Sequence, residues 1–289
     1  MATTILIVGA SGELGMQLVK ESIKRGFVVR ALTRSEQGFE KLKEYTDDIW
    51  RLDASSETNK LHDITSGIDY VVSALGKSIS LFNPTPNSFY DNDYKANKNI
   101  INDAKNHNVK RFFYVSMKGA DSASEFTIPR THKKVEEELE KSGLAYSIIR
   151  PVGFFSGLND LIIMAKRKII PLIGDGQAKT NSIYHGDLAK YIMTTFLDLP
   201  KLIEIGGPSI HTREEMAEMI KKHIGGKIIK MPTALAKVGS GFSDLISKDQ
   251  FGHKLSYFTY IMTHDMIAEK RGFLHFDDYL QGIDLSKIK

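Results

Sequence analysis

The 289-residue sequence contains no cysteine. This absence excludes disulfide bonds, thiolate metal ligands and a cysteine nucleophile, and it is compatible with a reducing compartment. No apolar run approaches the ~18 residues that a membrane-spanning helix requires. No basic segment precedes an apolar core at the amino end, so no signal peptide is predicted. We therefore expect a soluble, cytoplasmic protein that does not act on a membrane.

Charge of one sign is also not concentrated anywhere in the chain. The 39 Lys and Arg residues exceed the 35 Asp and Glu residues by four, and both signs are interspersed. The basic groups at 166–168 and 221–222 are too short for a nucleic-acid-binding stripe. A small basic excess instead suits an anionic cofactor. The histidines show no metal-ligand spacing, so we expect no metal site, and His107, His211 and His223 are expected on the surface.

What is present begins with the stretch TILIVGASGELG at residues 4–15. A continuous apolar run typical of a buried parallel strand ends at Gly9, and an amphipathic helical pattern follows. Gly9 permits a tight turn, Gly12 leaves room for a pyrophosphate, and Gly15 lets the helix pack against the strand. The helix start then directs its free N–H groups at phosphates. The spacing is G-x-x-G-x-x-G, and a glycine turn that binds nothing is the alternative.

Further strands alternate with helical segments along the first half of the chain. Strands are predicted over 27–33, 49–52, 70–75, 111–116 and 146–150. This alternation indicates βαβ units, and hence a Rossmann-type α/β fold with a doubly wound parallel sheet. We expect a nucleotide-binding domain over 1–155 and a small, mostly helical substrate lobe over 156–289. Some elements of the second segment are expected to return to the main sheet.

Arg34 follows the second strand, where such folds recognise the adenosine ribose. An NAD-preferring site carries Asp or Glu there, whereas Arg34, with Arg30 close by, suits the 2′-phosphate of NADP(H). An ordinary surface arginine is the alternative. Asp53 follows the third strand, and its two interpretations are an adenine contact and a helix cap.

Strand ends line the cofactor crevice in open parallel sheets. The predicted cofactor site collects residues from the glycine turn and from the ends of the successive strands. These residues are Gly9, Ser11, Gly12, Glu13, Leu14, Gly15, Arg34, Asp53, Ala74, Leu75, Gly76, Ser116, Lys133, Pro151, Val152 and Phe154.

Several motifs together resemble a known family. They are GASGELG, Arg34, SGLAYSIIRP at 142–151, IYHGDLAKY at 183–191 and IGGPSIHTREEMAEMI at 205–220. As a set, these resemble the atypical short-chain dehydrogenase/reductase superfamily, in particular its NmrA-like branch, over nearly the whole chain. The resemblance implies NAD(P) binding and a C-terminal lobe folded over the nicotinamide.

The Tyr-x-x-x-Lys pair of the wider superfamily is absent, because Pro129 and Arg130 stand four residues before Lys133 and Lys134. NmrA-like quinone and dye reductases, and plant phenylpropanoid reductases, place a His or Lys where this chain has His132. The resemblance therefore implies His132 and Lys133 as catalytic candidates.

His132 is expected to titrate near neutral pH and donate a proton, with Glu136 holding its ring from position i+4. Lys133 is the candidate for the ribose contact, and which of the two points inward stays open. A histidine at a helix start, exposed to water, is the alternative for His132.

Substrate recognition is expected between the loops after the fourth, fifth and sixth strands and the C-terminal lobe. Aromatic residues are available there to stack on a flat acceptor or to fill the core, namely Phe82, Phe89, Phe154, Phe155, Tyr184 and Tyr257. The leading hypothesis is an NADPH-dependent reductase of a small carbonyl, quinone or related electrophile. The alternatives are a non-enzymatic NADP(H)-binding regulator or assembly factor, and a nucleotide-sugar epimerase or dehydratase. The missing tyrosine counts against the latter.

Overall fold

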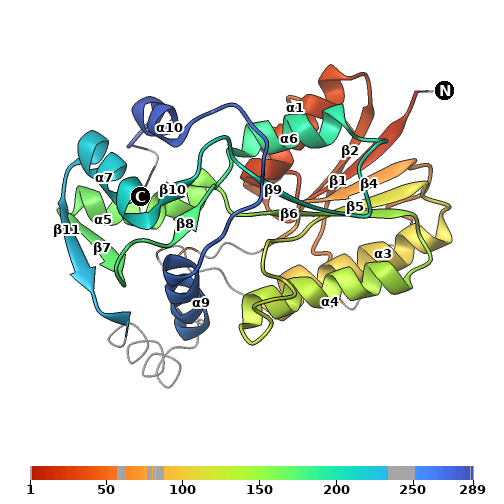
Figure 1. The fold of residues 1–289 in the computed structure, drawn as a ribbon. Helices are drawn as coiled ribbons and strands as arrows, with labels where there is room; N and C mark the ends of the chain where they lie inside the picture. Colours follow the sequence, from red (N-terminus) through yellow and green to blue (C-terminus); the bar gives the residue numbers. More distant parts are fainter. Residues whose placement is uncertain are drawn as a thin grey trace.

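The computed structural model describes residues 2–56, 61, 63–76, 80, 82, 88–233, 251–286 and 288. Its centre is a parallel sheet in which eight strands follow the order β12-β9-β6-β5-β4-β1-β2-β3 (Figure 1). The strands are β1 Thr4–Val8, β2 Val28–Thr33, β3 Ile49–Arg51, β4 Tyr70–Ser73, β5 Arg111–Val115, β6 Tyr146–Pro151, β9 Leu202–Gly206 and β12 Glu269–Lys270. The predicted Rossmann-type doubly wound fold is confirmed.

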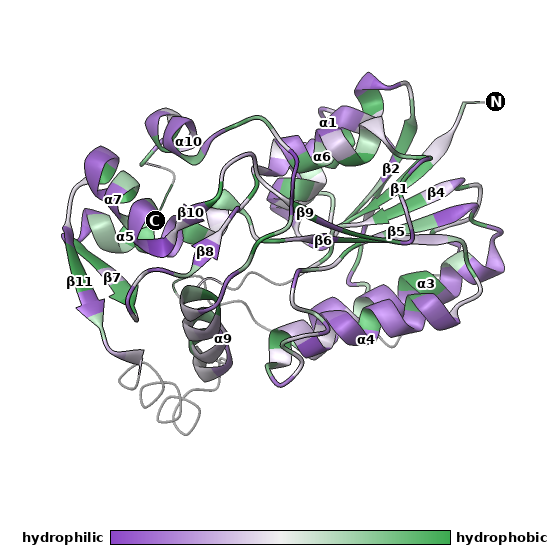
Figure 2. Cartoon of the chain, viewed as in Figure 1, coloured by the Kyte–Doolittle hydropathy of each residue, from purple (hydrophilic) through white to green (hydrophobic). Residues whose placement is uncertain are grey.

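Helices cover both faces of this sheet. Helices α1 (Glu13–Lys24) and α6 (His185–Thr194) pack on one face, whereas α3 (Ala96–Asn106) and α4 (Thr127–Lys141) pack on the other (Figure 1). Ile5 and Ile7 of β1 face the first pair, and Leu6 and Val8 face the second. Because each side chain from Ile5 to Val8 is buried by one layer or the other, this part of β1 shows no polar alternation. Figure 2 shows hydrophobic residues on the central strands and hydrophilic ones along α3 and α4.

The remaining elements form a smaller unit around a separate hydrophobic cluster. It contains η2 (Phe155–Leu158), α5 (Asn159–Lys166), α7 (Arg213–Ile224) and α10 (Phe276–Gly282), together with α9 (Phe251–Thr263) beside α4. Strand β7 (Ile169–Ile173) pairs in parallel with β11 (Lys227–Met231), and β8 (Lys179–Thr180) pairs antiparallel with β10 (His211–Thr212). No helix within the described ranges is both long and apolar enough to cross a bilayer.

Two segments beyond residue 155 return to the main sheet. Strand β9 pairs with β6, and β12 pairs with β9 at the sheet edge. Helix α6 packs on α1, and its buried apolar residues belong to the same cluster as Ile5 and Ile7 of β1. The second half of the chain therefore contributes to both units.

Some element boundaries differ from the expectations for local reasons. Strand β6 extends one residue beyond the predicted 146–150, to Pro151, whose carbonyl accepts a hydrogen bond from the Lys118 N–H at 2.9 Å. Proline is tolerated there because the last residue of a strand can lack an N–H donor. A π-helical turn, η1 (Tyr90–Lys95), directly precedes α3. The capping box of α7 is present, with Thr212 and Glu215 bonded reciprocally.

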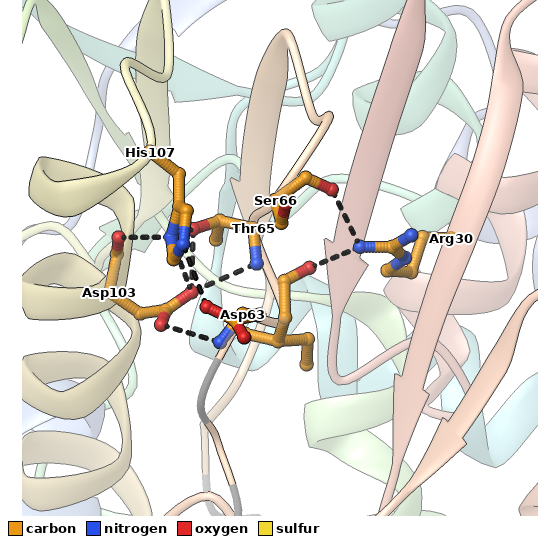
Figure 3. Close-up of polar contacts among 7 residues, drawn as sticks. Arg30, Asp63, Thr65, Ser66, Asp103 and His107 are labelled. Atoms are coloured by element: carbon orange, nitrogen blue, oxygen red, sulfur yellow. Dashed lines mark hydrogen bonds and ion pairs between the residues drawn. The ribbon is translucent and has the colours of Figure 1, made fainter.

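A polar cluster ties the loop before β4 to α3 (Figure 3). His107 Nε2 lies 3.0 Å from Asp63 Oδ1, and its Nδ1 lies 3.1 Å from Thr65 Oγ1. Asp103 Oδ2 accepts hydrogen bonds from the Thr65 backbone N–H and hydroxyl at 2.9 and 2.6 Å. The expectation of a plain surface histidine at 107 is therefore wrong, because its ring is half-buried in this network.

Arg30 joins the same loop from β2 (Figure 3). Its Nη1 donates to the carbonyls of Ile64 and Ser66, at 2.8 and 3.1 Å, and its Nε donates to Asp48 at 2.9 Å. Because its guanidinium donors serve the fold, the expectation that Arg30 assists in binding a 2′-phosphate is wrong.

Candidate cofactor and active site

The glycine turn between β1 and α1 is closely packed against the end of β4. Gly9 has φ +76°, and a Cβ there would lie 3.1 Å from both the Ala74 carbonyl oxygen and Leu75 Cα. A Cβ at Gly15 would lie 2.1 Å from the Gly9 carbonyl oxygen. Neither position accepts a side chain without moving backbone, so the tight turn and the close start of α1 both depend on glycine.

The start of α1 fits a dinucleotide pyrophosphate. Gly12 is the N-cap residue and forms no side-chain cap hydrogen bond, so the first-turn N–H groups of this 12-residue helix are left for another acceptor. These groups and the positive end of the helix dipole favour an anion. The Leu14 side chain is buried in the core, whereas 63% of the Glu13 side chain is exposed. Of these two residues, Leu14 therefore offers only its backbone.

Two predicted contacts with the adenosine half lie at the ends of β2 and β3. Ser11 Oγ lies 2.7 Å from Thr33 Oγ1, which fixes the glycine turn to the end of β2. The next residue, Arg34, is exposed and donates from Nη1 to the neutral Asn92 amide oxygen at 2.8 Å. Asp53 Oδ1 accepts hydrogen bonds from the Ser55 N–H and hydroxyl at 2.9 and 2.7 Å. Asp53 therefore closes a local turn, and its adenine contact stays a prediction.

His132 lies beside the end of β4. A Cβ at Gly76 would lie 3.8 Å from His132 Cε1, and only 9% of His132 is exposed. The alternative of a solvent-exposed histidine is therefore wrong. Its Nδ1 lies 2.7 Å from the hydroxyl of Tyr114 on β5. The expectation that Glu136 holds the ring is wrong, and Tyr114 is the partner.

Glu136 is engaged by a buried arginine instead. Arg150 of β6 donates from Nε and Nη2 to the two Glu136 carboxylate oxygens, at 2.8 and 2.7 Å. Ser116 Oγ donates to the same carboxylate at 2.6 Å, and Lys133 Nζ lies 3.6 Å from it. A bidentate guanidinium is a stronger partner for a carboxylate than a neutral imidazole. The residues after β5 are thus connected to α4 and β6 through one carboxylate.

His132 and Lys133 occupy different positions on α4. His132 is directed at Tyr114 beneath the strand ends, whereas Lys133 is directed at Glu136 with 29% of its side chain exposed. His132 is thus the more enclosed of the two candidates.

The other end of the site joins the sheet to the smaller unit. The Phe154 and His185 rings stack with centroids 4.1 Å apart and an interplanar angle of 19°. His185 Nδ1 lies 3.3 Å from Glu13 Oε2, which links α6 to the glycine turn. The Val152 N–H donates to the Ile205 carbonyl at 2.9 Å.

The other aromatic candidates for substrate stacking differ in exposure. Phe89, Phe155 and Tyr257 are buried in the core, Tyr184 is half-buried, and Phe82 is 40% exposed.

Two buried histidines are neutral at physiological pH. Burial lowers the pKa of His132 to about 4, and the nearby Glu136 charge only partly opposes this shift. Burial likewise lowers the pKa of His185 to about 4, against the charge of Glu13. The expectation that His132 titrates near neutral pH is wrong, because desolvation disfavours the imidazolium.

The lowered pKa values of His132 and His185 predict that the protein loses stability in mild acid. Their folded-state pKa values lie below the unfolded value of about 6.5, so the unfolded chain binds more protons. The free energy of unfolding is therefore unaffected by these histidines above pH 6.5. Each of them lowers it by up to about 3 kcal/mol as the pH falls to 4. Urea unfolding between pH 7 and pH 4.5 measures this slope. It should become shallower in H132Q and H185Q but not in H264Q, at an exposed histidine. Equal slopes in all of these proteins would contradict the prediction.

Three residues of the site were not predicted from the sequence: Tyr114, Arg150 and His185. A charged residue inside an otherwise apolar strand, as in YSIIRP, is the signal that could have identified Arg150. The apolar run RFFYVS gave no such signal for Tyr114, since a tyrosine there is equally typical of core packing.

A parallel sheet with this strand order and a glycine turn at the first strand–helix junction defines the Rossmann class of dinucleotide-binding proteins. The chain belongs to the NAD(P)H-binding family, whose family model matches residues 9–198. The predicted relationship to the NmrA-like, atypical short-chain dehydrogenases/reductases is confirmed at the level of an NAD(P)H-binding domain.

Curated relatives resemble most of this chain. A chloroplastic divinyl chlorophyllide a 8-vinyl-reductase from Arabidopsis thaliana is 30% identical over 84% of this chain and 63% of its own length. The photosystem II assembly factor Ycf39 of Cyanophora paradoxa is 33% identical over 54% of this chain and 47% of its own length. The chain thus spans less than two thirds of the length of these relatives.

Solved structures share the fold. An NADPH-dependent quinone oxidoreductase from Escherichia coli, solved with NADPH, has a TM-score of 0.73 at 18% identity, covering 96% of this chain and 98% of its own. A nucleoside-diphosphate-sugar epimerase from Staphylococcus aureus has a TM-score of 0.74 at 16% identity, covering 96% of this chain and 100% of its own. At these identities, the comparisons establish the fold alone.

Proposed function

We propose that the protein is an NADPH-dependent reductase that transfers a hydride to a small carbonyl, quinone or related electrophile. One observation carries this proposal: the glycine turn, the end of β4 and His132 are consecutive neighbours. Gly9 packs on Ala74 and Leu75, and the next residue, Gly76, lies against His132. A cofactor held at the turn and extended along the strand ends would approach a buried hydrogen-bonding group.

The chemistry divides between cofactor and protein. A bound reduced nicotinamide supplies a hydride to an electrophilic carbon, and an acceptor oxygen that gains the electron pair takes its proton from water. The protein's part is to bind, orient and stabilise. His132 offers a hydrogen bond at the end of β4. Ser116, directly after β5, and Lys133 of α4 both lie beside the Glu136 carboxylate, and the ribose contact is proposed there.

The proposed preference for NADP(H) rests on Arg34. Its guanidinium is exposed, and its contact with Asn92 is to a neutral amide, so its charge suits a 2′-phosphate. R34A should reduce the preference for NADPH over NADH by about 10- to 150-fold, equivalent to the ~1.5–3 kcal/mol of a charged hydrogen bond. Fluorescence titration with both cofactors measures this. K24A is the control, at a side chain that is 74% exposed at the far end of α1. An unchanged preference in R34A would contradict the assignment.

The reductase proposal is tested with purified protein and a panel of quinones and aldehydes. NADPH binding is measured first, and the loss of NADPH absorbance is then followed with each acceptor. Turnover of any acceptor above the protein-free rate supports the proposal. Binding without turnover of any acceptor would overturn it.

The second candidate is a regulator or assembly factor that binds NADP(H) without turnover. It is favoured by the likeness to Ycf39 assembly factors and by Pro129 and Arg130 at the positions where a catalytic tyrosine is sought. Binding without turnover in the same assay is the result this candidate predicts. The epimerase alternative is not favoured, since it rests on the fold and lacks that tyrosine.

A further inference from the structure

Tyr114 contacts the one catalytic candidate that lies at the end of β4. Its ring is fully buried on β5, and its hydroxyl lies 2.7 Å from His132 Nδ1. The two rings are nearly parallel, at 28°, with centroids 6.0 Å apart. The pair is held between the sheet and α4, so the imidazole has a fixed orientation.

The hydrogen in this pair belongs to the tyrosine. Burial raises the pKa of Tyr114 well above its ordinary value, so the hydroxyl stays protonated. Across the described residues it has no acceptor other than His132 Nδ1. Were Nδ1 to carry the hydrogen instead, the buried hydroxyl would lose its acceptor, at a cost of about 1–3 kcal/mol. Tyr114 therefore donates, Nδ1 accepts, and the ring hydrogen is on Nε2.

The surroundings of Nε2 agree with this tautomer. Asp93 Oδ2, from η1, lies 4.0 Å from Nε2, near enough to favour a hydrogen there but beyond hydrogen-bond distance. The other charged group nearby, Glu136, is engaged by Arg150 and Ser116. Nε2 thus carries a hydrogen that remains available, and 11% of the His132 side chain is exposed to receive a ligand.

We infer that Tyr114 is a positioning residue that fixes His132 as a neutral Nε2–H donor, so that His132 stabilises negative charge on an acceptor oxygen rather than acting as an acid. This inference rests on the proposed reductase function. A neutral imidazole that polarises a carbonyl through one N–H is an established catalytic arrangement elsewhere. It makes no demand for a histidine that titrates near neutrality.

The tautomer is tested by ¹⁵N NMR of histidine-labelled protein, with the His132 signals assigned through their loss in H132Q. We expect a protonated Nε2 and an unprotonated, hydrogen-bonded Nδ1. In Y114F, Nδ1 should shift toward the value of a nitrogen without a donor. Y94F is the matched control, since Tyr94 bonds Glu138 on the same helix and not His132. A protonated Nδ1 in the wild type, or no Nδ1 shift in Y114F, would overturn the inference.

Kinetics separate a neutral donor from an acid. H132Q places an amide N–H near the position of Nε2, and H132N places one nearer Nδ1. We expect H132Q to keep turnover within about 10-fold, and H132N to lose about 100-fold, comparable to removal of one oxyanion donor. Y114F should lower kcat more than it raises KM. Equal inactivity of H132Q and H132N would overturn the donor role.

The two levels of proposal fail separately. If the wild type reduces no acceptor, the reductase function fails and the donor role that rests on it fails too. The NMR result still decides whether Tyr114 fixes the tautomer.

Discussion

G15A should lose both cofactor binding and much of its stability. A Cβ at this position would lie 2.1 Å from the Gly9 carbonyl oxygen, 2.8 Å from Gly9 C and 2.9 Å from Ala10 Cα. All three are backbone atoms, so no side-chain rotation relieves the clash, and α1 must move away from β1. The helix start then no longer faces the turn that Gly9 makes. We expect a loss of about 3 kcal/mol, typical of severe overpacking.

Urea unfolding and NADPH titration measure the two effects of G15A. The matched control is G282A at the end of α10, where a Cβ would meet nothing within 4 Å. Alanine there should change stability by about 1 kcal/mol or less. A G15A protein that unfolds at the wild-type urea concentration and binds NADPH normally would contradict the close packing of the turn.

E136A should be nearly as destabilising, for an electrostatic reason. The Glu136 side chain is fully buried and that of Arg150 is 4% exposed, and the two form a bidentate pair. Removing one partner of a buried pair costs about 3–5 kcal/mol because the other charge is left in a poor environment. Arg150 retains Asp121 at 2.7 Å, so we expect the lower end of this range, about 3 kcal/mol.

The double variant E136M/R150M isolates the charge effect, since replacing both partners with apolar residues of similar size is often neutral. It should recover most of the stability that E136A loses. E140A, at an exposed position of the same helix, is the control and should unfold like the wild type. If E136A loses no more than E140A, the pair contributes nothing to the fold.

The fold was predictable where the signal was local. An apolar run closed by a glycine, followed by an amphipathic helix, identifies β1 and α1, because both patterns are set by residues close in sequence. The sequence did not specify that β9 and β12 belong to the same sheet, because strands of five and two residues carry little periodicity. Their pairing instead depends on contacts with residues at least 50 positions away in sequence, as between Ile148 and Leu202.

The site shows the same division. The sequence was sufficient to predict that Gly76, Ser116 and Arg34 follow strand ends at one edge of the sheet, since the carboxyl ends of parallel strands meet there. The hydrogen-bond partner of His132 could not be predicted in this way. Spacing of i+4 places Glu136 on the same helix face, but it does not reveal that Arg150 on a neighbouring strand competes for the carboxylate. Burial, which moved the pKa of His132, was likewise invisible at a helix start rich in charge.

The addition of β9 and β12 beyond β6 has a consequence for how the protein forms during translation. Until residues 202–206 have left the ribosome, the apolar strand β6 presents an open edge with unpaired peptide groups. Such edges pair readily with other chains. The sheet is complete only after residues 269–270 are made, so the outer edge of β9 stays open until that point of synthesis.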